Sequence, residues 1–278
     1  MKSGVNIKNV YCKNVFITGS SSGIGKACVL KLAKAGCSVT GVSRSCDEIV
    51  KKHSGGGSLT MKRMDVTDEA SIARVVGECE EIDIAVLAAG SGVAGAVEEL
   101  PMSYAREQME VNYFGVLNVL QAVIPKMREQ GKGLIVIIGS VAGRISIPMQ
   151  SHYSSSKYAL EALSDALRLE LRQFGIKVAV VEPGDTKTGF TDKRKTFVKE
   201  DSVYAAAVKD AVGQMEKDER GGVSPNKVAS VVVRLAGSKN PPARRAVGLK
   251  YKALCTAAKL LPDRLRESIV GSIYMKNN

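Results

Sequence analysis

The sequence predicts an α/β protein with a doubly wound parallel sheet that is covered by helices on both faces. Over roughly the first 180 residues, short continuous apolar runs alternate with longer segments whose apolar residues follow the helical period. Continuous apolar runs are typical of strands that are buried on both faces of a sheet. Their alternation with helices favours parallel strands joined by right-handed crossovers. A glycine-rich turn, GSSSGIG, joins the first strand to the first helix.

The elements follow from the period of the apolar residues and from the breakers between them. Strands are expected at 14–17, 38–43, 59–65, 84–88, 133–138 and 177–181. Helices are expected at 24–35, 47–52, 68–79, one or more within 103–130, and 153–174. Gly36 follows the first helix as a C-terminal cap.

The positive charge is concentrated at the C-terminal end of the chain. The formal net charge is +12, and residues 221–278 contribute +9 of it, with eleven Lys and Arg against Asp263 and Glu267. Such a concentration favours an anionic partner: a phosphate-bearing ligand, an acidic carrier, a membrane surface or nucleic acid. A basic helix that faces solvent explains the charge equally well. No nucleic-acid-binding motif accompanies it, so we expect no nucleic-acid partner.

Targeting and metal signals are missing from the sequence. The first residues, MKSGVNIKNVYCKN, contain no apolar segment of a secretory signal. Aliphatic runs such as 134–138 are far shorter than the about 18 residues that cross a bilayer. The six cysteines are scattered without a CxxC pair. We therefore expect no metal site and a reduced, cytoplasmic setting.

The first strand-to-helix turn, residues 18–25, reads TGSSSGIG and is suited to a phosphate group. Gly19 allows a sharp turn out of the strand, Gly23 allows backbone to approach a ligand, and Gly25 allows close packing of helix on sheet. The helix N-terminus offers free N–H groups and a partial positive charge. The spacing is GxxxGxG, and its position in the first strand–helix unit predicts dinucleotide binding.

Several motifs in a fixed order resemble those of the short-chain dehydrogenase/reductase family over roughly residues 12–190. They are TGSSSGIG, Asp65-Val66, Leu87-Ala88-Ala89-Gly90, Asn112, Ser140, Tyr153 with Lys157, and Pro183-Gly184. The resemblance implies a Rossmann-like fold and an oxidoreductase that interconverts a carbonyl and an alcohol. It implies a catalytic domain at 12–222, with a substrate lid at about 189–222. Residues 223–278 then form a basic helical extension, packed on or next to the substrate site.

The family resemblance assigns four catalytic residues. Tyr153 would be the general acid in reduction and the base in oxidation, and Ser140 would orient the substrate carbonyl. Lys157 lies one helical turn after Tyr153, and its ammonium group should lower the tyrosine pKa from its free value of about 10. The resemblance also has Lys157 bind the nicotinamide ribose and Asn112 hold a water that links Lys157 to solvent.

The end of the second strand indicates which cofactor binds. An acid there would accept hydrogen bonds from the ribose of NAD, but the sequence reads Ser43-Arg44-Ser45. Arg44 suits a 2′-phosphate, which favours NADP(H) over NAD(H). The cofactor-binding residues expected from the motifs are Thr18, Gly19, Ser20, Ser21, Ser22, Gly23, Ile24, Gly25, Ser43, Arg44, Ser45, Asp65, Val66, Ala88, Ala89, Gly90, Tyr153, Lys157, Pro183, Gly184, Thr186 and Thr188. Leu87 and Ala88 replace two asparagines that brace the sheet in the family, which leaves that brace in question.

The substrate end carries the weakest signals. The expected substrate residues are Ser140, Val141, His152 and Tyr153, with Arg144 as an anion-binding side chain. Small and aliphatic neighbours favour an apolar steroid-, retinoid- or acyl-like substrate. The helix containing Tyr251 would cover the lid, contact a membrane surface, or dock on its own domain or a second subunit. The family implies a homodimer or homotetramer. The alternative function is a regulatory protein that binds NADP(H) without turnover.

Overall fold

The computed structural model describes residues 13–52 and 56–275, and it contains one large sheet. The strand order is β10-β8-β7-β5-β1-β2-β4-β3, and every pairing is parallel except that of β3 with β4. The strands of this sheet are β1 (Asn14–Thr18), β2 (Ser38–Ser43), β3 (Ile49–Lys52), β4 (Ser58–Arg63), β5 (Ile84–Leu87), β7 (Gly133–Ile138), β8 (Ile176–Pro183) and β10 (Arg244–Val247).

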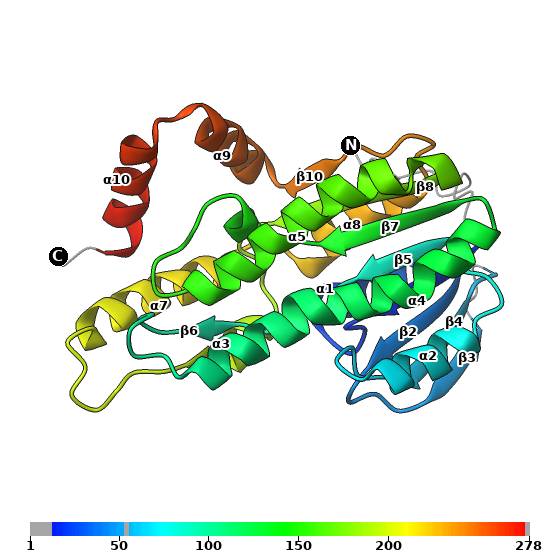
Figure 1. Ribbon diagram of the computed structural model, residues 1–278, viewed down its shortest axis with the longest axis horizontal. Coiled ribbons are helices and arrows are strands. Elements are labelled where there is room, and N and C mark those ends of the chain that lie inside the picture. Colours follow the sequence, from blue (N-terminus) through cyan, green and yellow to red (C-terminus); the bar gives the residue numbers. More distant parts are fainter. Residues whose placement is uncertain (1–12, 53–55, 276–278) are drawn as a thin grey trace.

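Helices cover both faces of the sheet, as Figure 1 shows. On one face, α1 (Gly23–Lys34) and α8 (Pro225–Ala236) share an apolar core with β1, β7 and β8. On the other face lie α2 (Glu69–Gly77), α4 (Gly115–Glu129) and α5 (Ser151–Glu170). The predicted doubly wound parallel sheet is confirmed. Shorter elements on this side are α3 (Met102–Met109), a π-helical turn at Glu110–Phe114 and 3₁₀ turns at Val141–Gly143 and Arg172–Phe174.

One predicted element is wrong. Residues 47–52, expected as a helix, contain the edge strand β3, which runs antiparallel to β4 and pairs Ile49 with Met61. The β-branched residues Ile49 and Val50 favour an extended chain, and β4 offers them an unpaired edge. Lys51 and Lys52 are exposed on this edge strand, where lysines discourage pairing with another chain.

A threonine connects the two central strands at the point where two asparagines of the family motif are replaced by Leu87 and Ala88. Thr18, at the end of β1, is buried, and its Oγ1 accepts hydrogen bonds from the N–H groups of Ala88 and Ala89 at 3.0 and 3.1 Å. These two residues follow β5, the neighbour of β1 in the sheet. The ends of the two central strands are therefore fixed to each other by one hydroxyl group.

The expected lid is an ordered layer beside the sheet. It contains α6 (Phe190–Lys193), β9 (Lys195–Thr196) and α7 (Ala205–Arg220). Strand β9 pairs in parallel with β6 (Val93–Ala94), which fixes this layer to the loop after β5.

The residues after 222 divide into two parts. Helix α8 and strand β10 belong to the sheet domain, because α8 packs on α1 and β10 is the edge strand beside β8. The expected boundary at residue 222 therefore falls inside the domain. Beyond it, α9 (Leu249–Leu260) and α10 (Asp263–Tyr274) project from the β10 side, and α10 reaches α7. Figure 1 shows this pair, in orange and red, standing apart from the sheet; we call it the C-terminal arm.

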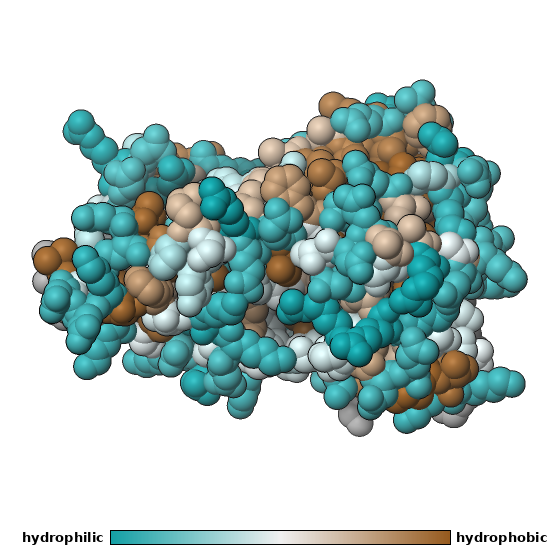
Figure 2. Space-filling view, turned by 60° about the horizontal axis from the view of Figure 1, so that its bottom comes forward, coloured by the Kyte–Doolittle hydropathy of each residue, from teal (hydrophilic) through white to brown (hydrophobic). Residues whose placement is uncertain are grey.

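The surface is mainly hydrophilic. Figure 2 shows one face on which teal side chains predominate and brown apolar groups gather in separate patches. Among the described residues, no helix combines the length and the apolar character needed to cross a membrane.

Candidate active site

A cavity of about 590 Å³ lies at the carboxyl ends of the parallel strands. Its wall combines the turn after β1, the ends of β2 and β7, the start of α5, the lid and the C-terminal arm. Ligands of open α/β sheets bind at this edge, where strand order reverses. The order β5-β1-β2 places that reversal beside β1.

The turn after β1 has the geometry that a pyrophosphate needs. Gly19 has a φ of +66°, and a Cβ there would lie 2.7 Å from the Ala88 carbonyl oxygen. A Cβ on Gly25 would lie 2.2 Å from the Gly19 carbonyl oxygen. Only glycine fits these positions, and the turn is held close to the N-terminus of α1. The Ser22 side chain at that N-terminus forms no capping hydrogen bond, which leaves backbone N–H groups for an anion.

The cavity brings together nearly all the residues that the motifs assigned to the cofactor. All of them line it except Thr18 and Ser20, which are buried behind the turn. Thr18 acts as the brace described above. The Ser20 N–H donates to the Val42 carbonyl and so ties the turn to β2.

The end of β2 presents a serine hydroxyl and an arginine to the cavity. Ser43 is buried at the cavity wall, and its hydroxyl has no hydrogen-bond partner among the residues described. Arg44 is exposed at the cavity rim, and none of the ion pairs formed by the described residues involves it. A buried unsatisfied hydroxyl beside an unpaired guanidinium is the arrangement expected where an anionic group binds.

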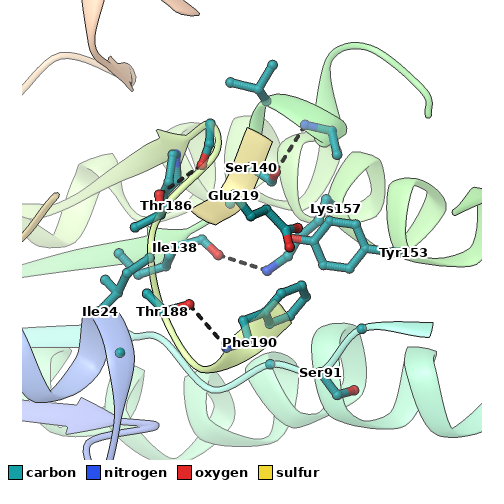
Figure 3. Close-up of a pocket in the computed structure, with 18 of the residues that line it drawn as sticks. Ile24, Ser91, Ile138, Ser140, Tyr153, Lys157, Thr186, Thr188, Phe190 and Glu219 are labelled. Atoms are coloured by element: carbon teal, nitrogen blue, oxygen red, sulfur yellow. Dashed lines mark hydrogen bonds between the residues drawn. The ribbon is translucent and has the colours of Figure 1, made fainter. Parts of the chain in front are cut away.

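Ser140, Tyr153 and Lys157 lie on the same side of the cavity, as Figure 3 shows. Lys157 is buried and its Nζ donates to the Ile138 carbonyl at 3.0 Å, while lying 5.7 Å from the centre of the Tyr153 ring. Ser140 Oγ accepts from the Ala142 N–H at 3.0 Å, which fixes the hydroxyl at the end of β7. All three side chains line the cavity.

The pKa of Tyr153 moves in the opposite direction to the one expected. Burial raises it to about 12, a hydrogen bond with Ser140 lowers it, and the charges of Glu219 and Arg194 raise and lower it respectively. Burial also lowers the pKa of Lys157 to about 8, against the opposing charge of Glu161. The net shift of the Tyr153 pKa is therefore upward in this structure, because desolvation is the larger effect.

Asn112 contacts protein groups directly and does not line the cavity. It lies in the π-helical turn, an irregularity that is frequent at functional sites. Its Oδ1 accepts from the Ser91 N–H at 2.8 Å, and its Nδ2 donates to the Ser91 carbonyl and to Ser156 Oγ, both at 3.1 Å. Asn112 thus connects the loop after β5 to α5 at Ser156, the residue before Lys157.

The substrate end differs in part from the sequence-based expectation. Val141 lines the cavity with Ser140 and Tyr153, but His152 does not. Arg144 forms an ion pair with the buried Glu182 at 3.2 Å, so it is not a free anion-binding group. The pairing follows from the position of Glu182 on β8 beside the turn that contains Arg144.

Several residues at the substrate end of the cavity belong to no motif that the sequence analysis identified. Phe190 of the lid packs against Tyr153, with 5.6 Å between ring centres. Glu219 of α7 lines the cavity at the same place. The C-terminal arm contributes an apolar wall, formed by Leu254, Ala258, Leu261, Ile269, Val270 and Ile273. Tyr251, in the helix that was expected to cover the lid, contact a membrane surface or dock on its own domain or a second subunit, lies against Gly184.

The geometry and the sequence match one family. The model of the family described as short chain dehydrogenase matches residues 13–199, which is more than half of the chain. The chain belongs to the short-chain dehydrogenase/reductase family. Activity on CH–OH and C=O groups with a nicotinamide cofactor is the shared property of this family, and the chain is an oxidoreductase of that class.

Two curated relatives cover almost the whole chain. A 3-ketodihydrosphingosine reductase of Bacteroides thetaiotaomicron is 36% identical over 267 residues, which are 94% of this chain and 97% of that protein. Retinol dehydrogenase 8 of Bos taurus is 29% identical over 284 residues, 96% of this chain and 89% of that protein. With these shares of the chain covered, the similarity extends into the C-terminal arm.

Solved structures agree with the fold. A short-chain dehydrogenase of Streptomyces avermitilis superposes with a TM-score of 0.77 at 29% identity and covers 96% of this chain and 98% of its own. Two more distant chains share the fold alone: one from Burkholderia cenocepacia was solved with NADP and one from Burkholderia phymatum with NAD. Both cofactors thus occur in proteins of this fold.

Proposed function

We propose that this chain is an NADP(H)-dependent oxidoreductase that interconverts a carbonyl and a secondary alcohol on an apolar small molecule. One observation carries the proposal: Ser140, Tyr153 and Lys157 line the same cavity as the phosphate-binding turn. A regulatory protein that only binds the nucleotide needs none of these three side chains. Their common position therefore favours turnover over that alternative.

Each reacting side chain has a distinct part in the proposed mechanism. NADP(H) bound along the turn supplies the hydride chemistry. Ser140 holds the substrate oxygen by a hydrogen bond, and Tyr153 donates its proton to that oxygen in the direction of reduction. The raised pKa of Tyr153 keeps its hydroxyl protonated at neutral pH. The Lys157 ammonium group, held by the Ile138 carbonyl, stabilises the deprotonated tyrosine. Asn112 fixes the helix that contains both residues.

The preference for NADP(H) rests on Arg44 at the end of β2. No acid lines the cavity at this strand end, where one would bind the ribose hydroxyls of NAD. A charge-assisted hydrogen bond contributes about 1.5–3 kcal/mol, which corresponds to roughly 10- to 100-fold in affinity.

An apolar substrate is supported by the wall of the C-terminal arm and by the names of the relatives. Aliphatic side chains of α9 and α10 line the same cavity as Tyr153. A ketodihydrosphingosine reductase and a retinol dehydrogenase are both similar to this chain over nearly its full length. We propose a substrate with a long apolar part that lies along the arm.

The assembly and cellular setting are also proposals. Helices α4 and α5, with the π-helical turn before α4, expose Phe114, Tyr158 and Leu169, which supports a homodimer or homotetramer formed through this face. The arm exposes Leu260 and Leu265 next to basic residues, which supports peripheral membrane contact. Cys28, Cys46, Cys79 and Cys255 are free thiols, which supports a cytoplasmic setting.

The experiment is a parallel fluorescence titration of NADPH and NADH on wild type, Arg44→Ala and Arg74→Ala, followed by a panel of ketones with the preferred cofactor. Arg74 is a control because it is an exposed arginine of α2 outside the cavity. We expect the wild type to prefer NADPH, Arg44→Ala to lose that preference and Arg74→Ala to keep it. Binding of neither cofactor, or binding without turnover of any ketone, contradicts the proposal.

A further inference from the structure

A buried ion pair lies beside the reacting tyrosine, where no family motif predicts one. Arg194, between α6 and β9, donates to a carboxylate oxygen of Glu219 on α7. The Arg194 side chain is 1% exposed and the Glu219 side chain 15% exposed. The guanidinium carbon of Arg194 also lies 5.8 Å from the centre of the Phe190 ring, which packs on Tyr153.

The pair is incompletely satisfied. Within the described residues, Glu219 Oε2 is buried without a hydrogen-bond partner, and so are Nε and Nη1 of Arg194. A buried carboxylate oxygen without a partner is unfavourable, and most such atoms in folded proteins are satisfied by protein, water or ligand. Glu219 lines the cavity whereas Arg194 lies behind the wall. Of the two residues, Glu219 is therefore the one that borders the space a ligand would occupy.

The carboxylate faces the reacting end of the cavity. Figure 3 shows the Glu219 side chain pointing from α7 toward the hydroxyl end of Tyr153. Its negative charge is among the groups that raise the pKa of Tyr153, as expected for a nearby acid. A substrate whose oxygen contacts Tyr153 and Ser140 consequently places its next few atoms beside Glu219.

The neighbouring charges favour a donor over an anionic group at this position. Asp185 and Asp218 lie close enough to act, together with Glu219, on the pKa of Tyr274 in α10, which burial raises to about 12. Among the cations that line the cavity near the lid and the arm, Lys195 and Arg266 are bound to Glu107 and Asp263. Lys250 lies over the Tyr251 ring, and Lys193 is exposed. This end of the cavity thus presents carboxylates to a substrate.

We propose that Glu219 Oε2 accepts a hydrogen bond from a hydroxyl or ammonium group of the substrate, carried close to the reacting carbonyl carbon. Arg194 fixes the carboxylate in place, and the apolar wall of the arm receives the remainder of the molecule. The substrate is therefore an amphiphile with a polar donor at its reacting end and a long hydrocarbon part. This inference rests on the proposed function and specifies the substrate class of the same site.

The test compares the binding of three long-chain secondary alcohols of equal length to the full-length protein. One carries an amino group on the carbon next to the hydroxyl carbon, one carries a hydroxyl there, and one carries neither. Binding is measured by titration calorimetry with NADPH present, so that an alcohol cannot turn over. The variants are Glu219→Gln, which keeps the side-chain size, and Glu216→Gln, the same change on α7 outside the cavity.

The wild type should bind the amino alcohol and the diol about tenfold or more tightly than the plain alcohol. Glu219→Gln should lose the preference for the amino alcohol, and it should keep part of the preference for the diol, because an amide oxygen still accepts a hydrogen bond. Glu216→Gln should retain both.

Equal wild-type affinity for the three alcohols, or no binding of any of them, overturns the inference. An equal loss of affinity for all three alcohols in Glu219→Gln also overturns the inference, because the ion pair of Glu219 with Arg194 would then have only a structural role. Reduction of the plain long-chain ketone with NADPH tests the proposed function separately. If the protein reduces this ketone but does not discriminate between the donors, the proposed function stands and the inference about Glu219 is refuted. If it binds the donors selectively but reduces no ketone, the proposed function is refuted and the binding role of Glu219 stands.

Discussion

Gly184 lies flat against the ring of Tyr251, so closely that a Cβ at residue 184 would lie 2.3 Å from ring carbons Cε1 and Cζ. The hydroxyl of Tyr251 donates to the neighbouring Asp185 carboxylate. Burial and this hydrogen bond both raise the pKa of Tyr251 above its ordinary range. The C-terminal arm is thus anchored on the turn after β8, which the family motif assigns to the nicotinamide. The contact between Tyr251 and Gly184 therefore joins the apolar wall of the arm to the proposed cofactor site.

Gly184→Ala should push the Tyr251 ring away from the turn after β8. Overpacking of a close contact costs about 1–3 kcal/mol, so we expect a lower free energy of unfolding and weaker NADPH binding. Gly189→Ala is the matched control, because a Cβ there meets nothing within 4 Å. The second change Tyr251→Ala should restore part of the NADPH affinity lost in Gly184→Ala. A double-mutant cycle with no coupling between the two positions would refute the anchoring role.

The pH dependence of reduction should follow Lys157. Tyr153, with a pKa of about 12, remains protonated through the neutral range, whereas Lys157, with a pKa of about 8, loses its charge as the pH rises through that value. We expect kcat/KM for ketone reduction with NADPH to be constant at lower pH and to fall above about pH 8. In Lys157→Arg, whose side chain stays charged, the fall should disappear even if activity is reduced. A wild-type profile that stays level to pH 10 would show that the lysine charge is not required.

The sequence predicted most of the residues that line the cavity near the turn after β1, because its signals there are local. Gly19 and Gly25 are required by the turn itself, and Tyr153 and Lys157 face one way because they are one helical turn apart. Position along the chain and the order of the strands were enough to bring these residues to one edge of the sheet.

The remaining features depend on packing between distant segments. The direction of the Tyr153 pKa shift is decided by burial under the lid, which no local pattern encodes. Glu219 reads as one charge in a polar helix until α7 packs beside Arg194. Residues 47–52 became a strand only because the edge of β4 was available.

Thr18→Val should destabilise the centre of the sheet. The substitution keeps the shape of the side chain but leaves the N–H groups of Ala88 and Ala89 without their acceptor. An unsatisfied group costs about 1–3 kcal/mol when it is buried, and these two groups are partly buried. We therefore expect a loss of about 1–3 kcal/mol in the free energy of unfolding, measured with urea. Thr60→Val, the same change on β4, is the control, because none of the hydrogen bonds within the described chain involves its hydroxyl. Equal effects of the two substitutions would mean that Thr18 is not a specific brace.

Leu169→Glu should weaken the proposed association through α4 and α5. Leu169 is 75% exposed in the single chain and shares this face with Phe114 and Tyr158, so a charge there would be buried against a second copy. We expect sedimentation velocity to show a dimer or tetramer for the wild type and a shift toward monomer for Leu169→Glu. Val50→Glu is the control, since Val50 is 77% exposed on β3, the strand at one edge of the sheet. A wild type that sediments as a monomer at micromolar concentration would contradict the assembly, while an unchanged oligomer in Leu169→Glu would place its interface elsewhere.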